Sequence, residues 1–322
     1  MSELLKNIDA RTKLAGTNKL EILLFFLGVD QRTGRRETYG INVFKVREVM
    51  RTPVITAAPD MPASVEGMVS LRGALVPVID LAKYSGISPE TPREIMIVTE
   101  YNGHTQGFLV EGVDTILRLD WSKMRVPPEM LTSQTGGLVT AVTELEDNRL
   151  VMMMDVEKVL SETTSIDNEI MYRGVVAVDS PDSTVFYCDD SSVARKQIER
   201  TLSAMGVRGI SAVNGRQMWE EMEKVAAYAQ SIGKPASSMI SLVLTDIEMP
   251  EMDGYILTKK IKSDPRFNGI AVIMHSSLSG MSNQKLGASV GVDEYVPKFE
   301  PLRLSETLAR RLGVENMPVR AA

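Results

Sequence analysis

The chain has 322 residues, of which 43% are hydrophobic and 24% are charged, and its formal net charge is -6 at pH 7. This length suits two domains better than one, and the composition is ordinary for a globular protein. The acidic balance argues against a nucleic-acid duplex as the main partner, because such binding rests on concentrated Lys and Arg. A single cysteine, Cys188, excludes an internal disulfide, and the two histidines form no His and Cys cluster that could hold zinc.

The N-terminus lacks the pattern of a signal peptide, namely a basic stretch, an apolar core and a small-residue cleavage site. The most apolar early run, Ile22 to Val29, has about eight residues, whereas a membrane span needs roughly 20. We therefore interpret this run as a buried strand, and we expect a cytoplasmic protein without direct membrane insertion.

The first half of the chain is predicted to be all-β, because short apolar runs alternate with Gly, Pro, Asn and Asp at the spacing of a barrel or sandwich. The expected strands are Leu20–Gly28, Tyr39–Val43, Val65–Leu71, Ala74–Ile79, Ile95–Thr99, Gln106–Val110, Leu138–Glu144 and Leu150–Met154. Short helical patterns are expected at Phe44–Met50 and Asp155–Ser161.

The apolar periodicity fades between residues 164 and 182, which are predicted to link domains at 18–163 and 183–314, with Val175–Val178 touching a domain edge. In the second half, strands alternate with helices, which predicts an α/β doubly wound, five-stranded parallel sheet with right-handed crossovers. The expected strands are Thr184–Cys188, Val207–Val213, Ile240–Thr245, Ile270–Met274 and Val292–Val296. The expected helices are Val193–Met205, Gln217–Ile232, Tyr255–Lys262, Gln284–Ser289 and Leu302–Leu312.

Charged residues follow three of these parallel strands: Asp189 and Asp190 the first, Asp246 the third and Lys298 the fifth. Ligands bind at the carboxyl ends of the strands in open α/β sheets, so these side chains are expected to converge. Two unit charges about 4 Å apart repel by roughly 4 kcal/mol at an effective dielectric near 20, so three carboxylates in one pocket need a counterion. Mg²⁺ with oxygen ligands fits, and Asp246 is then a nucleophile that forms an acyl phosphate.

Each of these residues also has an ordinary structural explanation. Asp190, which precedes Ser191 and Ser192, can cap a helix, and that role is compatible with metal binding. Asp246 alone can be a turn residue, and a lone lysine such as Lys298 is usually a solvated surface residue. The occurrence of all four charged residues at three strand ends of one sheet favours the pocket.

With these residues in place, the second half of the chain resembles the receiver domains of response regulators, and CheY closely. The resemblance covers Ser183 to about Gly313 and includes the Asp-x-x-Met-Pro-x-Met-Asp-Gly pattern that begins at Asp246. It implies that Asp246 is the phosphoacceptor and that Mg²⁺ is the cofactor. The metal ligands implied are Asp189, Asp190, Asp246 and the backbone carbonyl of Glu248. The switch residues and phosphoryl contacts implied are Ser276, Lys298 and Tyr295.

The chain departs from the receiver pattern in three places. Phe299 stands where a proline usually follows the lysine, which bears on the fine placement of Lys298. The segment between the acidic pair and Asp246 is longer than usual, with the excess expected near Ala226–Ser238, away from the pocket. The side chain of Glu248 is expected to affect the lifetime of the acyl phosphate.

The first half shows no catalytic pattern such as a Cys-His pair, Gly-x-Ser-x-Gly or a phosphate-binding glycine loop, so we expect a binding module. Its motifs resemble CheW from about Leu20 to Leu160, chiefly Val46-Arg47-Glu48-Val49, Leu71-Arg72-Gly73 and Val76-Pro77-Val78-Ile79-Asp80-Leu81. The resemblance implies two small SH3-like β-barrels that share a core. It also implies that Arg72 and Glu48, with Val46 nearby, contact partner proteins. By spacing alone, Arg72 can be an exposed hairpin arginine and Glu48 a solvated helix residue.

A CheW-like domain followed by a receiver resembles the CheV family. The resemblance implies a cytoplasmic adaptor that couples the cytoplasmic tips of methyl-accepting chemoreceptors to the histidine kinase CheA, at membrane receptor arrays, through protein contacts. CheA-dependent phosphorylation of Asp246 is expected to modulate the coupling, with no enzymatic activity beyond self-directed aspartyl phosphorylation and dephosphorylation.

Two alternatives remain open from the sequence. One is a phosphate sink that drains phosphoryl groups from CheA. The other is a phosphatase that uses Asp246 as its nucleophile. The phosphatase is disfavoured because haloacid-dehalogenase-type enzymes carry a second Asp two residues after the nucleophile, where this chain has Glu248.

Overall fold

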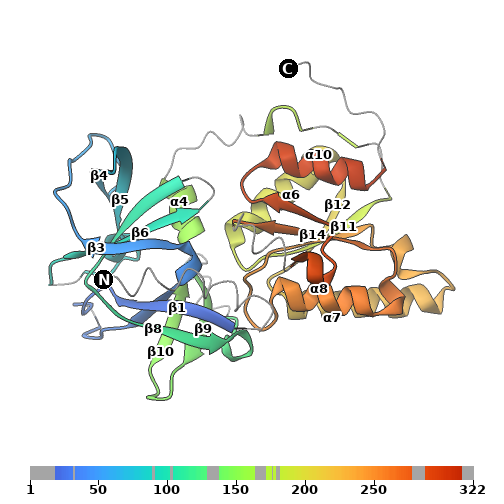
Figure 1. Cartoon of the computed structure of the whole chain (residues 1–322), viewed down its shortest axis with the longest axis horizontal. Helices are drawn as coiled ribbons and strands as arrows, with labels where there is room; N and C mark the ends of the chain where they lie inside the picture. The colour runs from blue at the N-terminus through green and yellow to red at the C-terminus, as the bar shows by residue number, and fades with distance from the viewer. Residues whose placement is uncertain are drawn as a thin grey trace. The chain divides into compact units, whose positions relative to one another are not determined.

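The structure is a computed structural model of the chain (Figure 1). It describes residues 19–31, 33–88, 91–101, 104–128, 138–163, 172–175, 177–178, 182–277 and 287–313. The chain divides into two compact units, with the boundary between Ser165 and Ile166. Among the residues described, no helix is both long enough and apolar enough to cross a membrane.

The N-terminal unit contains two five-stranded sheets. The strands of the first sheet are β1 (Lys19–Phe26), β2 (Thr38–Asn42), β8 (Gly112–Asp120), β9 (Val139–Glu144) and β10 (Leu150–Met154), in the order β8-β1-β2-β10-β9. Those of the second are β3 (Val46–Arg51), β4 (Val65–Leu71), β5 (Ala74–Asp80), β6 (Ile95–Tyr101) and β7 (His104–Val110), in the order β3-β6-β7-β5-β4. Short helical segments connect them: η3 (Val43–Lys45), α2 (Leu81–Tyr84), η4 (Trp121–Lys123) and α4 (Val156–Thr163). The predicted all-β class is confirmed.

One hydrophobic cluster joins the two sheets. Phe25 and Tyr39 of the first sheet belong to the same buried cluster as Ile97 and Phe108 of the second. The rings of Phe25 and Tyr39 stack with their centroids 5.9 Å apart. Because each sheet buries one face against the other sheet and the opposite face in a cluster of its own, the two share part of the apolar burial that stabilises the unit.

Two elements of this unit differ from the sequence-based prediction. The run Phe44–Met50 was predicted to be helical, but most of it is strand β3, which pairs with β6 so that Val49 lies opposite Ile97. Pairing with a neighbouring strand here overrides a weak local helical pattern. Strand β8 was not predicted, because it lies at a sheet edge with none of its residues buried and so lacks the alternation of a half-buried strand.

Asp80, in the Val-Pro-x-x-Asp-Leu motif, has a structural role at the end of β5. Its buried carboxylate accepts a hydrogen bond from the backbone nitrogen of Lys83 at 3.1 Å, which caps the short helix α2. Its Oδ2 forms an ion pair with Nη2 of Arg93 at 2.5 Å. The motif thus fixes the chain as it leaves the second sheet.

The C-terminal unit is built on the predicted parallel sheet. Its strands are β11 (Thr184–Cys188), β12 (Arg208–Ala212), β13 (Leu242–Thr245), β14 (Ala271–Ser276) and β15 (Glu294–Pro297), in the order β12-β11-β13-β14-β15. Every neighbouring pair is parallel. This is a doubly wound order with a switch point between β11 and β13.

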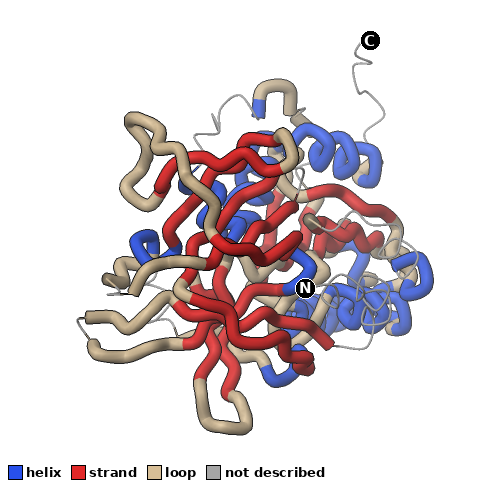
Figure 2. The backbone as a smooth tube through the Cα atoms, turned by 60° about the vertical axis from the view of Figure 1, so that its left-hand side comes forward, coloured by secondary structure: helices blue, strands red, loops and turns tan. Residues whose placement is uncertain are grey.

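Helices cover both faces of this sheet (Figure 1). The helices α6 (Ser192–Met205) and α10 (Pro301–Arg311) pack on one face, and α7 (Gly215–Ser231) and α8 (Gly254–Ser263) on the other. Figure 2 shows the same arrangement from another side, with strands between two helical layers. The helix expected at Gln284–Ser289 lies partly outside the described residues, and residues 287–290 are helical.

Two further expectations for this unit are met. Val178 is buried in the same cluster as α6 and α10, and its backbone nitrogen donates to the carbonyl of Met205 at 2.7 Å, so this end of the linker touches the domain edge as predicted. The segment Ala226–Ser238, where the extra length before Asp246 is expected, forms the C-terminal part of α7 and η5 (Ala236–Ser238). Because α7 starts beside the carboxyl ends of the strands and runs back, this segment lies at the opposite edge of the sheet, away from the pocket.

We predict that Asp80→Ala lowers the free energy of unfolding of the N-terminal unit by about 3 kcal/mol, at the lower end of the range for breaking a buried ion pair. Urea denaturation followed by Trp121 fluorescence, in a Trp219→Phe background, measures this unit separately. Lys83→Ala is the control, because its ion pair with Glu66 is exposed and is worth less than about 1 kcal/mol. Equal effects of the two substitutions would contradict the role assigned to Asp80.

Candidate functional site

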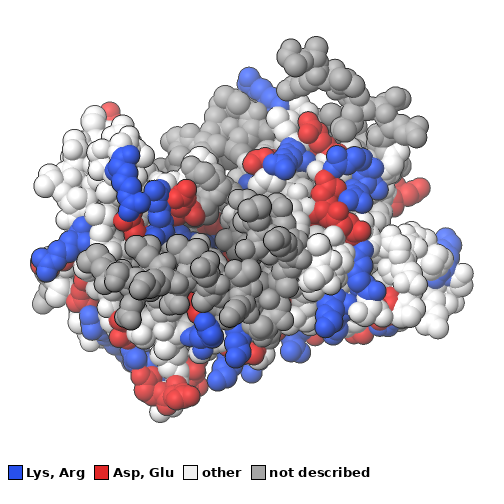
Figure 3. All heavy atoms as spheres, in the orientation of Figure 1, with Lys and Arg blue, Asp and Glu red and all other residues white. Residues whose placement is uncertain are grey.

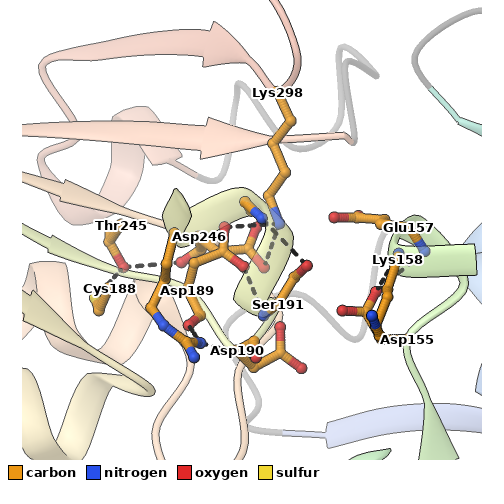
Figure 4. A network of polar contacts seen from close by, with 12 residues as sticks. Asp155, Glu157, Lys158, Cys188, Asp189, Asp190, Ser191, Thr245, Asp246 and Lys298 are labelled. Carbon is orange, nitrogen blue, oxygen red and sulfur yellow. Dashed lines mark hydrogen bonds and ion pairs between the residues drawn. The ribbon is translucent and has the colours of Figure 1, made fainter. Parts of the chain in front are cut away.

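Acidic side chains from two loops meet at the carboxyl edge of the parallel sheet (Figure 4). Asp189 and Asp190 follow β11, and Asp246 follows the adjacent strand β13. Each of the three offers a carboxylate oxygen, and these oxygens all lie within 4.8 Å of one another. The convergence predicted from strand ends is therefore present in the fold.

Lys298 approaches the acidic cluster from the end of β15 and contacts two of its members (Figure 4). Its Nζ lies 2.9 Å from Oδ2 of Asp189 and 3.2 Å from Oδ2 of Asp246. The lysine side chain is 2% exposed, so it is not the solvated surface residue of the alternative explanation. Three carboxylates that offer oxygen atoms this close together are a ligand set suited to a hard divalent cation.

The loop between β11 and α6 holds the acidic pair through its own hydrogen bonds. Oδ1 of Asp189 accepts from the backbone nitrogen of Ser191 at 2.9 Å. The hydroxyl oxygen of Ser191 accepts from the backbone nitrogen of Ala194 at 3.4 Å and caps α6. The alternative in which Asp190 caps this helix is therefore wrong, because Ser191 takes that position. The carboxylate of Asp190 belongs to the acidic cluster instead.

A chain of buried hydrogen bonds fixes Asp246 at the end of β13. Its backbone nitrogen donates to the carbonyl of Cys188 at 2.9 Å, and the hydroxyl of Thr245 donates to its carbonyl oxygen at 2.9 Å. The thiol of Cys188 donates to the hydroxyl oxygen of Thr245 at 3.2 Å. Burial raises the pKa of this thiol, so it keeps its proton and remains a donor.

Gly254, at the end of the motif that begins at Asp246, is required by close packing. A Cβ on this residue would lie 2.0 Å from the carbonyl oxygen of Asp246. The start of α8 therefore rests directly on the backbone of the candidate phosphoacceptor. Only glycine permits that approach without displacing Asp246.

The other predicted site residues of this unit lie at the same edge. Ser276 ends β14 opposite Pro297, and its carbonyl accepts from the backbone nitrogen of Lys298 at 3.3 Å. Glu248 follows Asp246 by two residues, and the role of its backbone carbonyl stays a prediction. Phe299 has a φ of 63°, uncommon for a bulky side chain, yet Lys298 reaches both carboxylates.

Tyr295 on β15 is held by two partners. Its hydroxyl hydrogen-bonds with the hydroxyl of Tyr255 and with the backbone of Gly287. Both rings belong to a cluster with Met274, and Tyr255 is buried. A Cβ on Gly287 would lie 1.7 Å from the Tyr295 hydroxyl, so the absence of a side chain at this position makes room for it. Burial is the main reason that the pKa of both tyrosines is raised.

The N-terminal unit brings two of its predicted contact residues together. Nη2 of Arg72 lies 3.0 Å from Oε2 of Glu48, in an exposed ion pair. Arg72 and Gly73 are the two residues between β4 and β5, and their φ angles of 52° and 84° are those of a tight hairpin turn. Arg72 is thus an exposed hairpin arginine, which is compatible with contacting a partner.

Glu48 and Val46 are placed differently from the prediction. Glu48 lies on strand β3 and not on a helix. Val46, predicted beside the contact residues, is buried in the core that joins the two sheets, so its side chain is not part of the exposed surface. Leu75, which sequence reasoning missed, lies in the same hairpin and is 74% exposed. An apolar residue that starts a strand carries no mark in the sequence of which side it faces.

The comparisons with known proteins cover both units. Residues 24–164 match the family model of the CheW-like domain, and residues 185–309 match that of the response regulator receiver domain. The chemotaxis protein CheV3 of Helicobacter pylori is 28% identical over 301 residues, which cover 92% of this chain and 95% of that protein. This chain has the CheV-type arrangement, a CheW-like domain followed by a response regulator receiver domain.

Relatives of each unit alone support this assignment of the CheV-type chain. The chemotaxis protein CheW of Klebsiella aerogenes is 32% identical over 49% of this chain and 93% of its own length. The chemotaxis protein CheY1 of Helicobacter pylori is 34% identical over 40% of this chain and 95% of its own length. The CheV-type chain thus joins a CheW-like domain to a receiver domain.

We predict that Gly287→Ala displaces the Tyr295 hydroxyl from Tyr255 in this CheV-type chain. Because burial raises the pKa of both tyrosines, their neutral forms contribute fully to stability below pH about 10 and lose that contribution as the pH rises further. In the variant, we expect one more tyrosine to ionise near pH 10, measured by ultraviolet titration. The neighbouring exposed substitution Ala288→Ser is the control, and an identical titration of both variants would contradict the contact.

Proposed function

We propose that this CheV-type adaptor couples chemoreceptors to the histidine kinase CheA and that phosphorylation of Asp246 by CheA modulates the coupling. Proteins of the CheW and CheV families couple chemoreceptors to CheA, which supports the two partners. The observation that carries the regulatory part is the convergence of three carboxylates and Lys298 at one edge of the receiver sheet. We place the protein in the cytoplasm, at membrane receptor arrays, through protein contacts.

Mg²⁺ is the proposed cofactor of the receiver, held by Asp189, Asp190 and Asp246 with the backbone carbonyl of Glu248. The donor set supports this choice, because three carboxylates offer hard oxygen ligands within 4.8 Å of one another. When bound, the ion neutralises charge on the phosphoryl oxygens during transfer.

The carboxylate of Asp246 acts as the nucleophile in the proposed transfer. One of its oxygens attacks the phosphorus of a phosphohistidine on CheA, so a phosphorus–oxygen bond forms while the phosphorus–nitrogen bond breaks. The electron pair stays on the imidazole nitrogen, which takes up a proton from water. Lys298, which already contacts Asp246, exchanges part of that contact for the phosphoryl oxygens.

The proposed readout of phosphorylation passes through Ser276 and Tyr295. The hydroxyl of Ser276, at the same sheet edge, turns toward the phosphoryl group, and Tyr295 leaves Tyr255 and Gly287 as β15 adjusts. The charge of the phosphoryl group thereby shifts the equilibrium between two conformations of Tyr295 and β15. Coupling energies of this kind are about 1–3 kcal/mol, so we expect modulation of CheA control and not an all-or-none gate.

The N-terminal unit supplies the proposed partner surface at the exposed pair formed by Glu48 and Arg72, beside Leu75. Opposite charges together with an exposed apolar side chain are typical of the rim and core of a protein interface. On the face shown in Figure 3, basic and acidic side chains are interspersed, without the continuous basic patch that a nucleic acid would need.

We predict that Asp246→Asn accepts no labelled phosphoryl group from phosphorylated CheA in the presence of Mg²⁺. The wild-type chain should be labelled under the same conditions and should stay unlabelled when EDTA is present during the incubation. Glu220→Gln, an exposed substitution on α7 with the same change of charge, is the control and should be labelled as the wild type is. Absence of label on the wild type would remove the regulatory half of the proposal.

The same variant distinguishes modulation from a phosphate sink. Under the proposal, Asp246→Asn changes receptor control of CheA activity in a reconstituted receptor array. A sink predicts unchanged receptor control together with greater phosphoryl flow to other receivers. Turnover of a generic phosphate ester that depends on Asp246 would instead indicate a phosphatase.

We predict that Arg72→Glu weakens binding to CheA or receptor fragments by about 10-fold, because one charge of the interface is reversed. The free energy of unfolding of Arg72→Glu should differ from that of the wild type by less than about 1 kcal/mol, since the ion pair with Glu48 is exposed. Arg118→Glu is the matched control, because Arg118 forms an exposed cross-strand pair with Glu21 in the other sheet, at 2.6 Å. Equal losses in calorimetric binding for the two variants would argue against this surface.

A further inference from the structure

Arg195, in the first turns of α6, contacts the backbone that carries the acidic pair. Its Nη1 donates to the carbonyl oxygen of Asp189 at 2.6 Å and to that of Asp190 at 3.0 Å. A single guanidinium nitrogen therefore bridges two successive carbonyls of the loop between β11 and α6. Sequence reasoning did not select this residue, because an arginine six positions after an aspartate has no distinctive pattern.

The contact adds an anchor that the rest of the loop does not provide. The Asp189 side chain is fixed by the Ser191 backbone nitrogen at 2.9 Å, and its own backbone nitrogen donates to the carbonyl of Ala212 at 3.3 Å. Arg195 extends this anchoring to the carbonyl of Asp190, whose side chain is less buried than that of Asp189. Both carbonyls are directed toward α6, and the carboxylates of the same two residues lie in the cluster with Asp246.

The charge of Arg195 and its geometry have opposite effects on a bound cation. A guanidinium near the pocket repels a cation, so its removal by itself would tighten Mg²⁺ binding. A guanidinium that orders the loop keeps the carboxylates converged, so its removal would weaken Mg²⁺ binding. Groups that orient metal ligands typically change metal affinity by about 10–100-fold when they are lost. The sign of the change therefore identifies which effect dominates.

We propose that Arg195 is a positioning residue of the receiver pocket: by bridging the carbonyls of Asp189 and Asp190, it holds their carboxylates in the arrangement that binds the divalent cation. The inference rests on the proposed function in that the cation is the Mg²⁺ of phosphoryl transfer. Arg195 contacts backbone carbonyls of the acidic pair, so its proposed effect on the cation acts through those two residues.

The test uses the full chain and two substitutions, Arg195→Gln and Arg195→Lys. We expect Arg195→Gln to bind Mg²⁺ about 10-fold more weakly by calorimetry. We expect Arg195→Lys to be weakened to a similar extent although it keeps the charge, because the strongly hydrated ammonium on its flexible stem holds the two carbonyls less rigidly. Lys196→Gln, an exposed neighbour that loses the same charge, is the control and should bind Mg²⁺ as the wild type does.

A second measurement needs no metal. In Mg²⁺-free protein, hydrogen exchange of a peptide spanning Asp189–Ala194 should be faster in Arg195→Gln than in the wild type, because the Ser191 amide loses protection when the loop loosens. Phosphoryl transfer from CheA should show a raised Mg²⁺ requirement and a rate at saturating Mg²⁺ close to that of the wild type. A general loss of folding would instead lower the rate at every Mg²⁺ concentration.

Two results would overturn the inference. Mg²⁺ binding that is unchanged or tighter in Arg195→Gln, with unchanged hydrogen exchange, would show that the contact does not position the carboxylates. Failure of the wild-type chain to bind Mg²⁺ would overturn the metal pocket of the proposed function together with this inference. If the wild type and Arg195→Gln bind Mg²⁺ with equal affinity, the role of Arg195 is overturned and the metal pocket of the proposed function stands.

Discussion

Electrostatic repulsion among Asp189, Asp190 and Asp246 is the constraint on which the receiver unit depends. Their oxygens lie within 4.8 Å of one another, and Lys298 contacts the carboxylates of Asp189 and Asp246. Such an arrangement is unfavourable for isolated side chains, so the surrounding structure has to stabilise it. Packing around the strands holds the three carboxylates together as a pocket of oxygen donors.

The backbone around the pocket shows how this stabilisation is achieved. Gly254 lets α8 pack against the carbonyl of Asp246, and the Thr245 hydroxyl donates a hydrogen bond to that carbonyl. Arg195 donates hydrogen bonds to the backbone carbonyls of the acidic pair. Asp80 in the other unit is a useful contrast. It is as buried as Asp189, but its carboxylate caps α2 and forms an ion pair with Arg93, so its role is to stabilise the fold.

The parts of the structure that followed from sequence are those with strong periodicity. The parallel sheet, both helical layers and the strand β10, with its run of methionines, were predicted because buried faces repeat regularly along them. Strand β8 was missed and β3 was assigned as a helix, because an edge strand and a short strand owe their form to pairing with neighbours. The alternative cap at Asp190 gives way to Ser191 for a similar reason: adjacent capping residues are interchangeable in sequence, and only the path of the loop selects one.

The sequence by itself determined the classes of the two units and the identity of the charged residues at the strand ends, because hydrophobic periodicity along the chain depends on local sequence. Only the tertiary structure decided that Lys298 is buried between two carboxylates, that Val46 is a core residue, and that Gly287 accommodates the Tyr295 hydroxyl. These features depend on contacts between segments that are distant in the chain. Side-chain direction and backbone proximity across such distances are set by packing, which no local pattern encodes.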